Sequence, residues 1–216
     1  MIPLQFALRR RMMMAGGGGA PISELPLGTL INVGTDGGDG AANYEIADKD
    51  NLVSGGVVLV RKNIHSKSAF GSSTTYPGDT LDNKMTSIYN SLPEKLKSKI
   101  MDATFNLYSV EGDITRKMFA LTKTMAGYGN NSGVAEGKAL QLYTSNASRV
   151  KTFNGPADNW WLSSRSASGS AWHVGTDGSA DRSPLDMSGV VPAFVISSET
   201  PYNATPNTDG SYNLIL

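Results

Sequence analysis

Residues 159–197 read NWWLSSRSASGSAWHVGTDGSADRSPLDMSGVVPAFVIS, and this stretch decides the fold. It begins with the apolar run Trp160-Trp161-Leu162 and ends with the apolar run Val190–Ile196. Runs that can bury so much apolar area are typical of buried strands. The residues between them are mainly serine, glycine and aspartate, with isolated large side chains, so they cannot pack as a core. Because many recognition surfaces consist of a polar loop on a rigid sheet, we expect Ser163–Ser188 to be an irregular binding loop.

Other apolar segments predict further strands. They are Leu27–Val33, Tyr44–Ala47 and Val57–Val60, the last being apolar throughout, as expected of a central strand. Val190–Ile196 should also lie near the sheet centre, with both faces buried. Pro192 lacks a donor for the ladder, so we expect it at the start of that strand or in a bulge.

The pattern from Thr80 to Met101 predicts two helices. Met85 and Ile88 share one face of the first, while Ser91 and Glu94 have the spacing of a capping box that begins the second. The apolar residues Ile114, Met118, Leu121 and Met125 also have helical spacing, although Met118–Leu121 could be a strand. A short helix is expected within Val134–Arg149. Strands and helices together predict an α+β domain.

Three motifs resemble those of a family of uncharacterised bacterial and prophage domains, W-W-L-R-S, D-G-S and G-V-R-P-A. The matching residues are Trp160-Trp161-Leu162, Asp177-Gly178-Ser179 and Gly189–Phe194. The chain departs from the family where Ser163 and Val191 replace arginines, so no role of those arginines is carried over. The resemblance covers Leu25–Ser198. It implies a C-type-lectin-like fold with a short, twisted antiparallel sheet and two or more helices.

Composition excludes several classes of protein and site. The chain has 216 residues, with 19 basic and 19 acidic side chains, so no global field attracts it to nucleic acid or to an anionic membrane. No apolar run is long enough for a membrane insertion. Cysteine is absent, which excludes disulfides, thiolate metal sites and thiol nucleophiles. We therefore expect partners other than nucleic acid or membrane lipid.

The N-terminal residues form a second signal. In Met1–Arg11 the arginines follow the apolar run, the reverse of the order in a cleavable signal peptide, and four glycines come next. Alternating apolar residues suit a docking arm that adds a strand to a neighbour's sheet, and the alternative is a disordered tail. This opening resembles those of small phage structural proteins. The expected docking residues are Ile2, Leu4, Phe6, Leu8, Arg9, Arg10 and Arg11.

The expected domain organisation has three parts. Residues 1–21 form the docking arm and its glycine linker, residues 22–199 the C-type-lectin-like domain, and residues 200–216 a C-terminal tail. The tail is either a final strand or another contact with a partner.

The sequence gives no sign of catalysis. The two histidines, His65 and His173, lack a neighbouring metal-binding pattern, and no G-x-S-x-G elbow is present. Gly127–Gly133 resembles a nucleotide loop but has the wrong spacing. Aspartates at 36 and 39 and at 177, 181 and 186 could hold Ca²⁺, but turn capping explains them more simply. We expect no catalytic residue, no cofactor and no metal.

The expectation for function is a non-enzymatic bacteriophage virion protein on the tail, baseplate or capsid surface. It would bind a host-surface glycan or protein through the predicted loop, contact other virion proteins through the arm, and form a homo-oligomer. The virion would assemble in the cytoplasm of the bacterial host. The expected ligand-binding residues are Arg165, Trp172, His173, Asp181 and Arg182, with Trp160 and Trp161 as scaffold. The alternatives are a capsid or tail decoration protein and, third, a glycan-active enzyme with a carboxylate pair.

Overall fold

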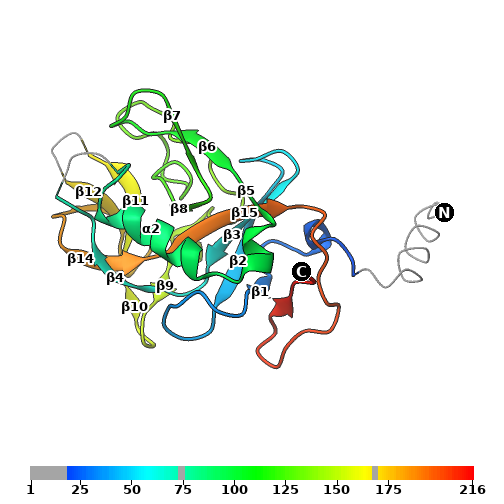
Figure 1. Cartoon of the computed structure of the whole chain (residues 1–216). Coiled ribbons are helices and arrows are strands. Elements are labelled where there is room, and N and C mark those ends of the chain that lie inside the picture. Colours follow the sequence, from blue (N-terminus) through cyan, green and yellow to red (C-terminus); the bar gives the residue numbers. More distant parts are fainter. Residues whose placement is uncertain (1–18, 73–75, 167–169) are drawn as a thin grey trace.

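A seven-stranded sheet forms where the continuous apolar runs of the sequence pair with one another (Figure 1). A computed structural model describes residues 19–72, 76–166 and 170–216. The docking-arm residues, Ile2 to Arg11, lie outside this described part of the chain. In order across the sheet, the strands are β16 (Tyr212–Asn213), β1 (Leu30–Asn32), β2 (Asn43–Lys49), β3 (Gly56–Arg61), β15 (Pro192–Ser197) and β5 (Ile100–Met101), with β8 (Met118–Ala120) also paired to β15. All these pairs are antiparallel except β1 with β16.

A second sheet has five strands. In order they are β13 (Ala180–Ser183), β12 (Ala171–Val174), β11 (Trp160–Arg165), β14 (Met187–Val190) and β4 (Ser66–Ala69), with β11 and β14 parallel. Two small pairs complete the strands of the described residues: β6 (Ala103–Asn106) with β7 (Asp113–Arg116), and β9 (Lys151–Thr152) with β10 (Ala157–Asp158). The prediction of an irregular loop at Ser163–Ser188 is therefore wrong, because this segment contains the hairpin β12–β13.

The helices of the described residues are short. They are the 3₁₀ turn η1 (Ile22–Glu24), α2 (Thr80–Ser91), α3 (Glu94–Lys97) and α4 (Asn146–Arg149). Helix α2 begins at Thr80 and has Asp79 as its N-cap, whose carboxylate accepts from the backbone N–H of Thr80. The helix packs against β8 and β4. Its buried face includes Met85 and Ile88, as predicted. No helix in the described ranges is long and apolar enough to cross a membrane.

The predicted capping box is wrong. Ser91 ends α2, and its hydroxyl donates to the carbonyl oxygens of Ile88 (2.7 Å) and Asp36 (2.6 Å). Helix α3 begins after Pro93 without a side-chain cap. The apolar residues from Ile114 to Met125, whose spacing suggested a helix, do not form one, since Ile114 lies in β7 and Met118 lies in β8. Strand β8 is buried at all three positions, and β7 buries only Ile114, so the helical spacing of these apolar residues is coincidental.

The chain passes from the second sheet to the first at Val191. Strand β14 ends at Val190 and β15 begins at Pro192, so the proline stands at the start of a strand, as predicted. Strand β15 lies between β3 on one side and β5 and β8 on the other, and it is buried from Pro192 to Ile196. A Cβ at Gly189 would lie 2.7 Å from the carbonyl oxygen of Asn159, which explains why that position has no side chain.

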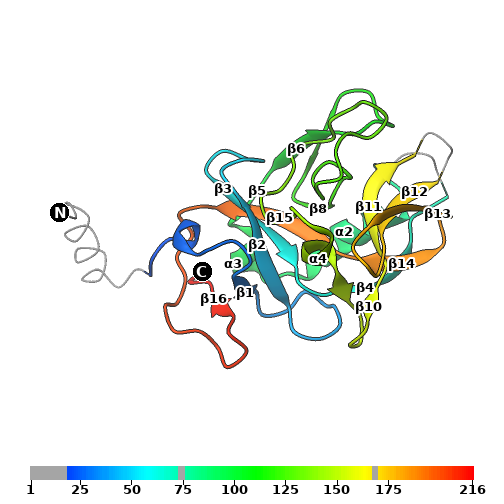
Figure 2. The same cartoon turned by 180° about the vertical axis from the view of Figure 1, so that it is seen from behind.

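The fold class is α+β, as predicted, with sheet predominant. Trp160 and Trp161 are 0% and 1% exposed, so both belong to the core. Figures 1 and 2 show β1 and β16 at one end of the molecule and β11, β12 and β13 at the other. Residues 200–216 contribute β16, and Ala20 accepts a backbone hydrogen bond from Tyr202, so the first and last described segments lie side by side.

Candidate functional site

Strand alternation separates the predicted binding residues into two groups. In the β12–β13 hairpin, Trp172 lies opposite Arg182, and His173 lies opposite Asp181. Residues directly opposite each other share a face, and successive residues point to opposite faces. Trp172 and Arg182 therefore lie on one face of the sheet, and His173 and Asp181 lie on the other. The predicted binding residues thus lie on strands and not in a loop, and the alternation of β12 and β13 distributes them over two faces.

Trp172 is half-buried, and other parts of the chain approach its indole. The indole Nε1 donates to Oδ1 of Asn131 at 3.1 Å. The Lys123 ammonium lies 4.4 Å from the ring centroid, and the guanidinium carbon of Arg182 lies 5.2 Å from it. Both distances are within the range of cation–π attraction. We call Lys123, Asn131, Trp172 and Arg182 the Trp172 site.

A buried network lies beneath this site. Asn131 is 1% exposed, and its Nδ2 donates to Oε1 of Glu136 at 3.1 Å and to the carbonyl oxygen of Arg165 at 2.7 Å. The Ser164 hydroxyl donates to the other carboxylate oxygen of Glu136 and accepts from the backbone N–H of Lys123. The buried carboxylate thus positions the Asn131 side chain and the backbone at Lys123. Such a satisfied network holds its members rigidly.

The tip of the hairpin is fastened to the same loop. The Tyr128 hydroxyl donates to the carbonyl oxygen of Gly178, and burial raises the pKa of Tyr128 to about 12, so the hydroxyl keeps its proton. Gly178 has φ +79°, and a Cβ there would lie 1.9 Å from the carbonyl oxygen of Asn146. Only glycine fits this turn, which gives the D-G-S motif a structural cause.

On the opposite face, His173 lies near the core tryptophan Trp161, and Asp181 lies opposite His173 on β13. The ring of His173 is 6.0 Å from that of Trp161. Burial lowers the pKa of His173 below its ordinary value of 6.5, against the opposing charge of Asp181, so the imidazole is neutral at pH 7. Arg165 is only 3% exposed and lies 5.5 Å over the ring of Phe70. Arg165 therefore belongs to the packed interior more than to a surface.

The Trp172 site is cationic. Among the described residues, no carboxylate forms an ion pair with Lys123 or Arg182. The Lys123 ammonium donates to the carbonyl oxygen of Asn130 at 3.2 Å, and Arg182 is exposed. Within the same described ranges, no three acidic or histidine residues are grouped as metal ligands would be. The site offers two cationic donors and an indole at defined positions.

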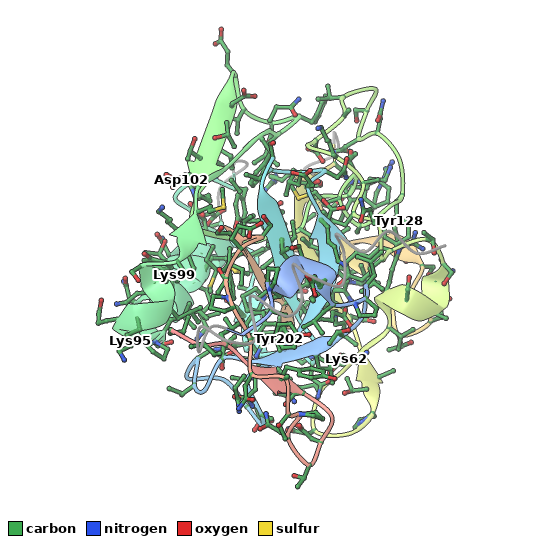
Figure 3. The ribbon with its side chains drawn as sticks, turned by 90° about the vertical axis from the view of Figure 1, so that its right-hand side faces the viewer. Lys62, Lys95, Lys99, Asp102, Tyr128 and Tyr202 are labelled. Atoms are coloured by element: carbon green, nitrogen blue, oxygen red, sulfur yellow. The ribbon has the colours of Figure 1, made fainter. Side chains whose placement is uncertain are left out.

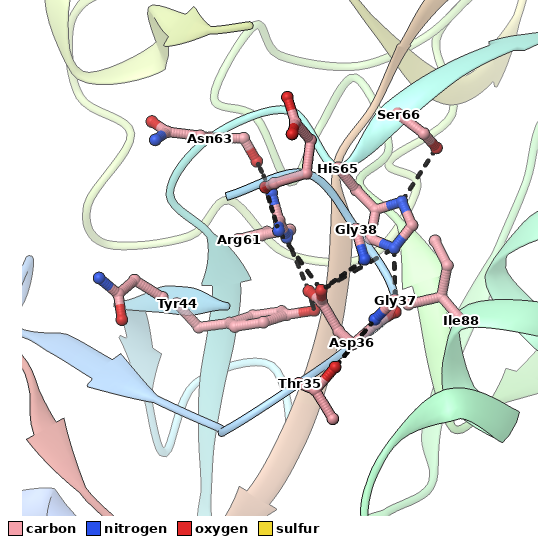
Figure 4. Close-up of polar contacts among 12 residues, drawn as sticks. Thr35, Asp36, Gly37, Gly38, Tyr44, Arg61, Asn63, His65, Ser66 and Ile88 are labelled. Carbon is pink, nitrogen blue, oxygen red and sulfur yellow. Dashed lines mark hydrogen bonds and ion pairs between the residues drawn. The ribbon is translucent and has the colours of Figure 1, made fainter. Parts of the chain in front are cut away.

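Asp36, one of the aspartates considered for calcium, has another role (Figure 4). Its carboxylate accepts from Arg61 Nε at 2.7 Å and from the Tyr44 hydroxyl at 2.9 Å, while its carbonyl oxygen lies 3.0 Å from Nε2 of His65. Burial would raise the pKa of Asp36, but Arg61 outweighs it and holds that pKa below the ordinary 3.8. The carboxylate is thus committed to an internal ion pair. His65 belongs to the same network, which fastens the loop at residue 36 to β3 and α2.

Two residues of the Trp172 site, Lys123 and Asn131, were not predicted. Asn131 lies about forty positions before the hairpin, in the glycine-rich segment 127–133. Lys123 lies about fifty positions before it, in the segment whose apolar spacing suggested a helix. No spacing rule connects them to Trp172, and a compact fold alone brings them together. Nothing in the sequence around Glu136 indicated that its side chain is buried beneath the site.

Comparison with known proteins gives one match. The profile of a family described as a domain of unknown function (DUF6273) matches residues 54–198, about two thirds of the chain. No curated protein and no solved structure gives a significant match. The matched range runs from β3 to β15 and includes every residue of the Trp172 site, whereas β1, β2 and β16 lie outside it.

Proposed function

The chain belongs to the DUF6273 family, and we propose that it is a non-enzymatic domain that binds a ligand at the Trp172 site. The observation that carries this proposal is the half-buried indole with two cations beside it that form no ion pair with any described carboxylate. Aromatic and guanidinium side chains contribute most of the binding energy at many interfaces. Here the buried Asn131 positions the indole before any ligand arrives, so less conformational freedom is lost on binding.

The place of the site in the fold supports display on a particle. The hairpin β12–β13 lies at one end of the molecule, and the first described residues lie beside the C-terminal segment at the other (Figure 2). A Cβ at Gly19 would lie 2.8 Å from Cδ1 of Ile215, so the chain enters the fold at the end opposite the site. An arm at residues 1–18 that docks on other virion proteins would leave the Trp172 site facing outward.

We therefore propose a bacteriophage virion protein on the tail, baseplate or capsid surface that binds the host-cell surface and forms a homo-oligomer through its docked arms. The support for the phage context is the resemblance of the motifs and of the N-terminal residues. We further propose that the fold is C-type-lectin-like. In support, the first and last strands of the described chain, β1 and β16, pair with each other, and the segments around the second sheet carry the site.

Sedimentation with bacterial cell envelopes tests the binding. The full chain and the double variant Lys123→Ala/Arg182→Ala are mixed with purified envelopes from a panel of bacteria, and the bound fraction is measured. Each anchor side chain is worth about 1–2 kcal/mol, so the double variant should bind about 30-fold to 1,000-fold more weakly. The matched control is Lys95→Ala/Lys99→Ala, which removes two exposed lysines of the α3 region. Equal retention of all three proteins would overturn the proposal.

The virion context has its own test. Particles induced from a bacterium that carries the gene are purified, and their proteins are identified by mass spectrometry. The proposal expects the protein in the particles and expects its loss when residues 1–19 are deleted. If particles that contain the double variant adsorb to cells normally, and particles without the protein fall apart, the decoration role is correct instead.

A further inference from the structure

We propose that the Trp172 site recognises an anionic group, the carboxylate or phosphate of an acidic surface polysaccharide. This inference rests on the proposed function and names the ligand class of the same site. The first observation is the distribution of charge. The chain as a whole is neutral, yet two cationic side chains lie beside one indole. Asn131 and Trp172, the other members of the site, carry no charge.

Among the described side chains, several other cations are paired with carboxylates, unlike Lys123 and Arg182. Arg61, Arg116 and Lys151 are each within 2.7 Å of a carboxylate oxygen. Lys123 and Arg182 have no such partner among the described residues, although Asp181 is adjacent to Arg182 in sequence. The Asp181 carboxylate accepts from the backbone N–H of Arg182 at 2.7 Å, and its side chain belongs to the other face of the strand. The nearby Glu136 is buried, and in the described part of the chain its carboxylate accepts from uncharged donors: Asn131, Ser164 and the backbone of Tyr108.

The indole holds these cations without neutralising them. Cation–π attraction restricts long, flexible side chains, but the charge remains available to a ligand. A guanidinium presents parallel N–H donors that match a carboxylate or phosphate, and an ammonium adds a point charge. An oxyanion that binds beside the indole therefore meets cationic groups that are already confined.

A sugar polymer fits the site better than other polyanions. Trp172 is only half-buried, so its exposed part can contact the C–H groups of a sugar ring next to the charged group. The cationic area is small, and the balanced net charge supplies no wider field for the regularly spaced phosphates of nucleic acid. The site also lies at the end of the molecule opposite the first described residues, where a long polymer could reach it.

Titration with defined oligomers tests this inference. The probes are oligogalacturonate, which carries carboxylates, oligomeric glycerol phosphate, which carries phosphodiesters, and fully methyl-esterified oligogalacturonate, which is neutral. Calorimetry gives the affinity of each for the intact chain. We expect at least one acidic oligomer to bind about tenfold or more tightly than the neutral one, with the affinity lost near 1 M NaCl, where the screening length is about 3 Å. The preferred acidic oligomer identifies carboxylate or phosphate as the source of the charge.

Matched variants locate the charge requirement. Lys123→Gln and Arg182→Gln should each weaken the acidic oligomer about fivefold to tenfold, and Lys95→Gln and Lys99→Gln, with the same change of charge, should not. Figure 3 shows Lys95 and Lys99 on the other side of the molecule from Tyr128, which belongs to the loop of the site. Unchanged affinity in Lys123→Gln and Arg182→Gln overturns the inference, as does equal or absent binding of the acidic and neutral oligomers.

Two further outcomes separate this inference from the proposed function. If the alanine double variant loses envelope binding but the neutral oligomer binds as tightly as the acidic ones, the binding function stands and the anionic ligand is wrong. If envelope binding survives in that double variant, the proposed function itself fails. Tighter binding of oligoglutamate than of either acidic oligomer would replace the polysaccharide with an acidic protein segment.

Discussion

The indole nitrogen of Trp172 donates to Oδ1 of Asn131 at 3.1 Å, and this bond links an exposed hairpin to the buried interior. The side-chain amide of Asn131 in turn donates to the Glu136 carboxylate and to the carbonyl oxygen of Arg165. One amide thus uses its acceptor for the surface residue and its two donors for the core. The position of the recognition residue is therefore set by groups that no ligand touches.

Replacing Asn131 with leucine tests this linkage. The change removes the Asn131 amide donor from both the buried Glu136 carboxylate and the Arg165 carbonyl oxygen, so we expect a loss of about 2–4 kcal/mol in the free energy of unfolding. Urea denaturation followed by circular dichroism measures it. Asn130→Leu is the matched control, because Asn130 is exposed and should change stability by less than about 0.5 kcal/mol. Equal losses in the two variants would show that Asn131 does not support the site.

The two Asp-Gly-Ser turns provide an internal comparison. Gly178 and Gly210 have φ of +79° and +80°, but a Cβ at Gly178 would meet the Asn146 carbonyl oxygen at 1.9 Å, whereas nothing lies within 4 Å at Gly210. Gly210→Ala should cost only the left-handed conformation, about 1–2 kcal/mol. Gly178→Ala should cost at least about 2 kcal/mol more, because the hairpin must move off the loop. Thermal or urea unfolding measures both, and similar losses would contradict the close approach.

The buried ion pair of Glu45 gives a third prediction. Lys151, buried, lies 2.5 Å from Glu45, and Lys62, half exposed, lies 3.2 Å from the other carboxylate oxygen. Lys151→Met leaves a buried charge with its weaker partner, so we expect a loss of about 3–5 kcal/mol. Lys62→Met should cost about 1 kcal/mol or less, since an exposed partner is screened by water. Guanidinium denaturation measures both losses, and the reverse order would be inconsistent with this account.

The free energy of unfolding should decrease as the pH is lowered through the range in which histidine is protonated. Burial lowers the pKa of His65 below 6.5, although the Asp36 carbonyl and carboxylate oppose the shift and Arg61 and Lys84 favour it. The unfolded chain therefore binds more protons than the folded chain once the pH falls below 6.5, and stability decreases there. Burial lowers the pKa of His173 as well, so His173 also makes the folded chain less stable as the pH falls.

The measurement is the free energy of unfolding from pH 7.5 to 5 for the wild type and for His65→Gln. The variant should be less stable at pH 7.5 and should have a shallower dependence on pH. Parallel curves would mean that His65 does not remain neutral in the folded chain. At lower pH a further loss is expected, because the pKa values of Asp36 and Glu45 also lie below their ordinary 3.8 and 4.5 in the folded state.

Much of the framework could be predicted because it depends on local apolar patterns. Strands β3 and β15 are continuous apolar runs, and α2 has a clear buried face, so each was predicted at nearly its observed position. The burial of Trp160 and Trp161 follows from the same reasoning. These elements need only the hydrophobic pattern of their own residues.

The site could be predicted only in part. Trp172 and Arg182 were identified from side-chain type, but the polar residues around them concealed the strands β12 and β13, and with them the alternation that turns His173 and Asp181 to the other face. An edge hairpin with small polar residues lacks the apolar signal by which strands are recognised. Lys123 and Asn131 approach Trp172 only through long-range folding, which residue spacing does not encode.

The central claim is that a ligand binds at Trp172, and indole nuclear magnetic resonance tests it most directly. The three tryptophans give three indole N–H resonances, and Trp172→Phe assigns one of them. Trp160 and Trp161 are 0% and 1% exposed, with indole nitrogens that donate to the backbone of Arg149 and Ser68, so they serve as internal controls. The protein is titrated with polysaccharide released from the envelopes that retain it. The account predicts that the Trp172 resonance shifts with a saturating curve while the other two stay constant; saturation of binding with an unmoved Trp172 resonance would contradict it.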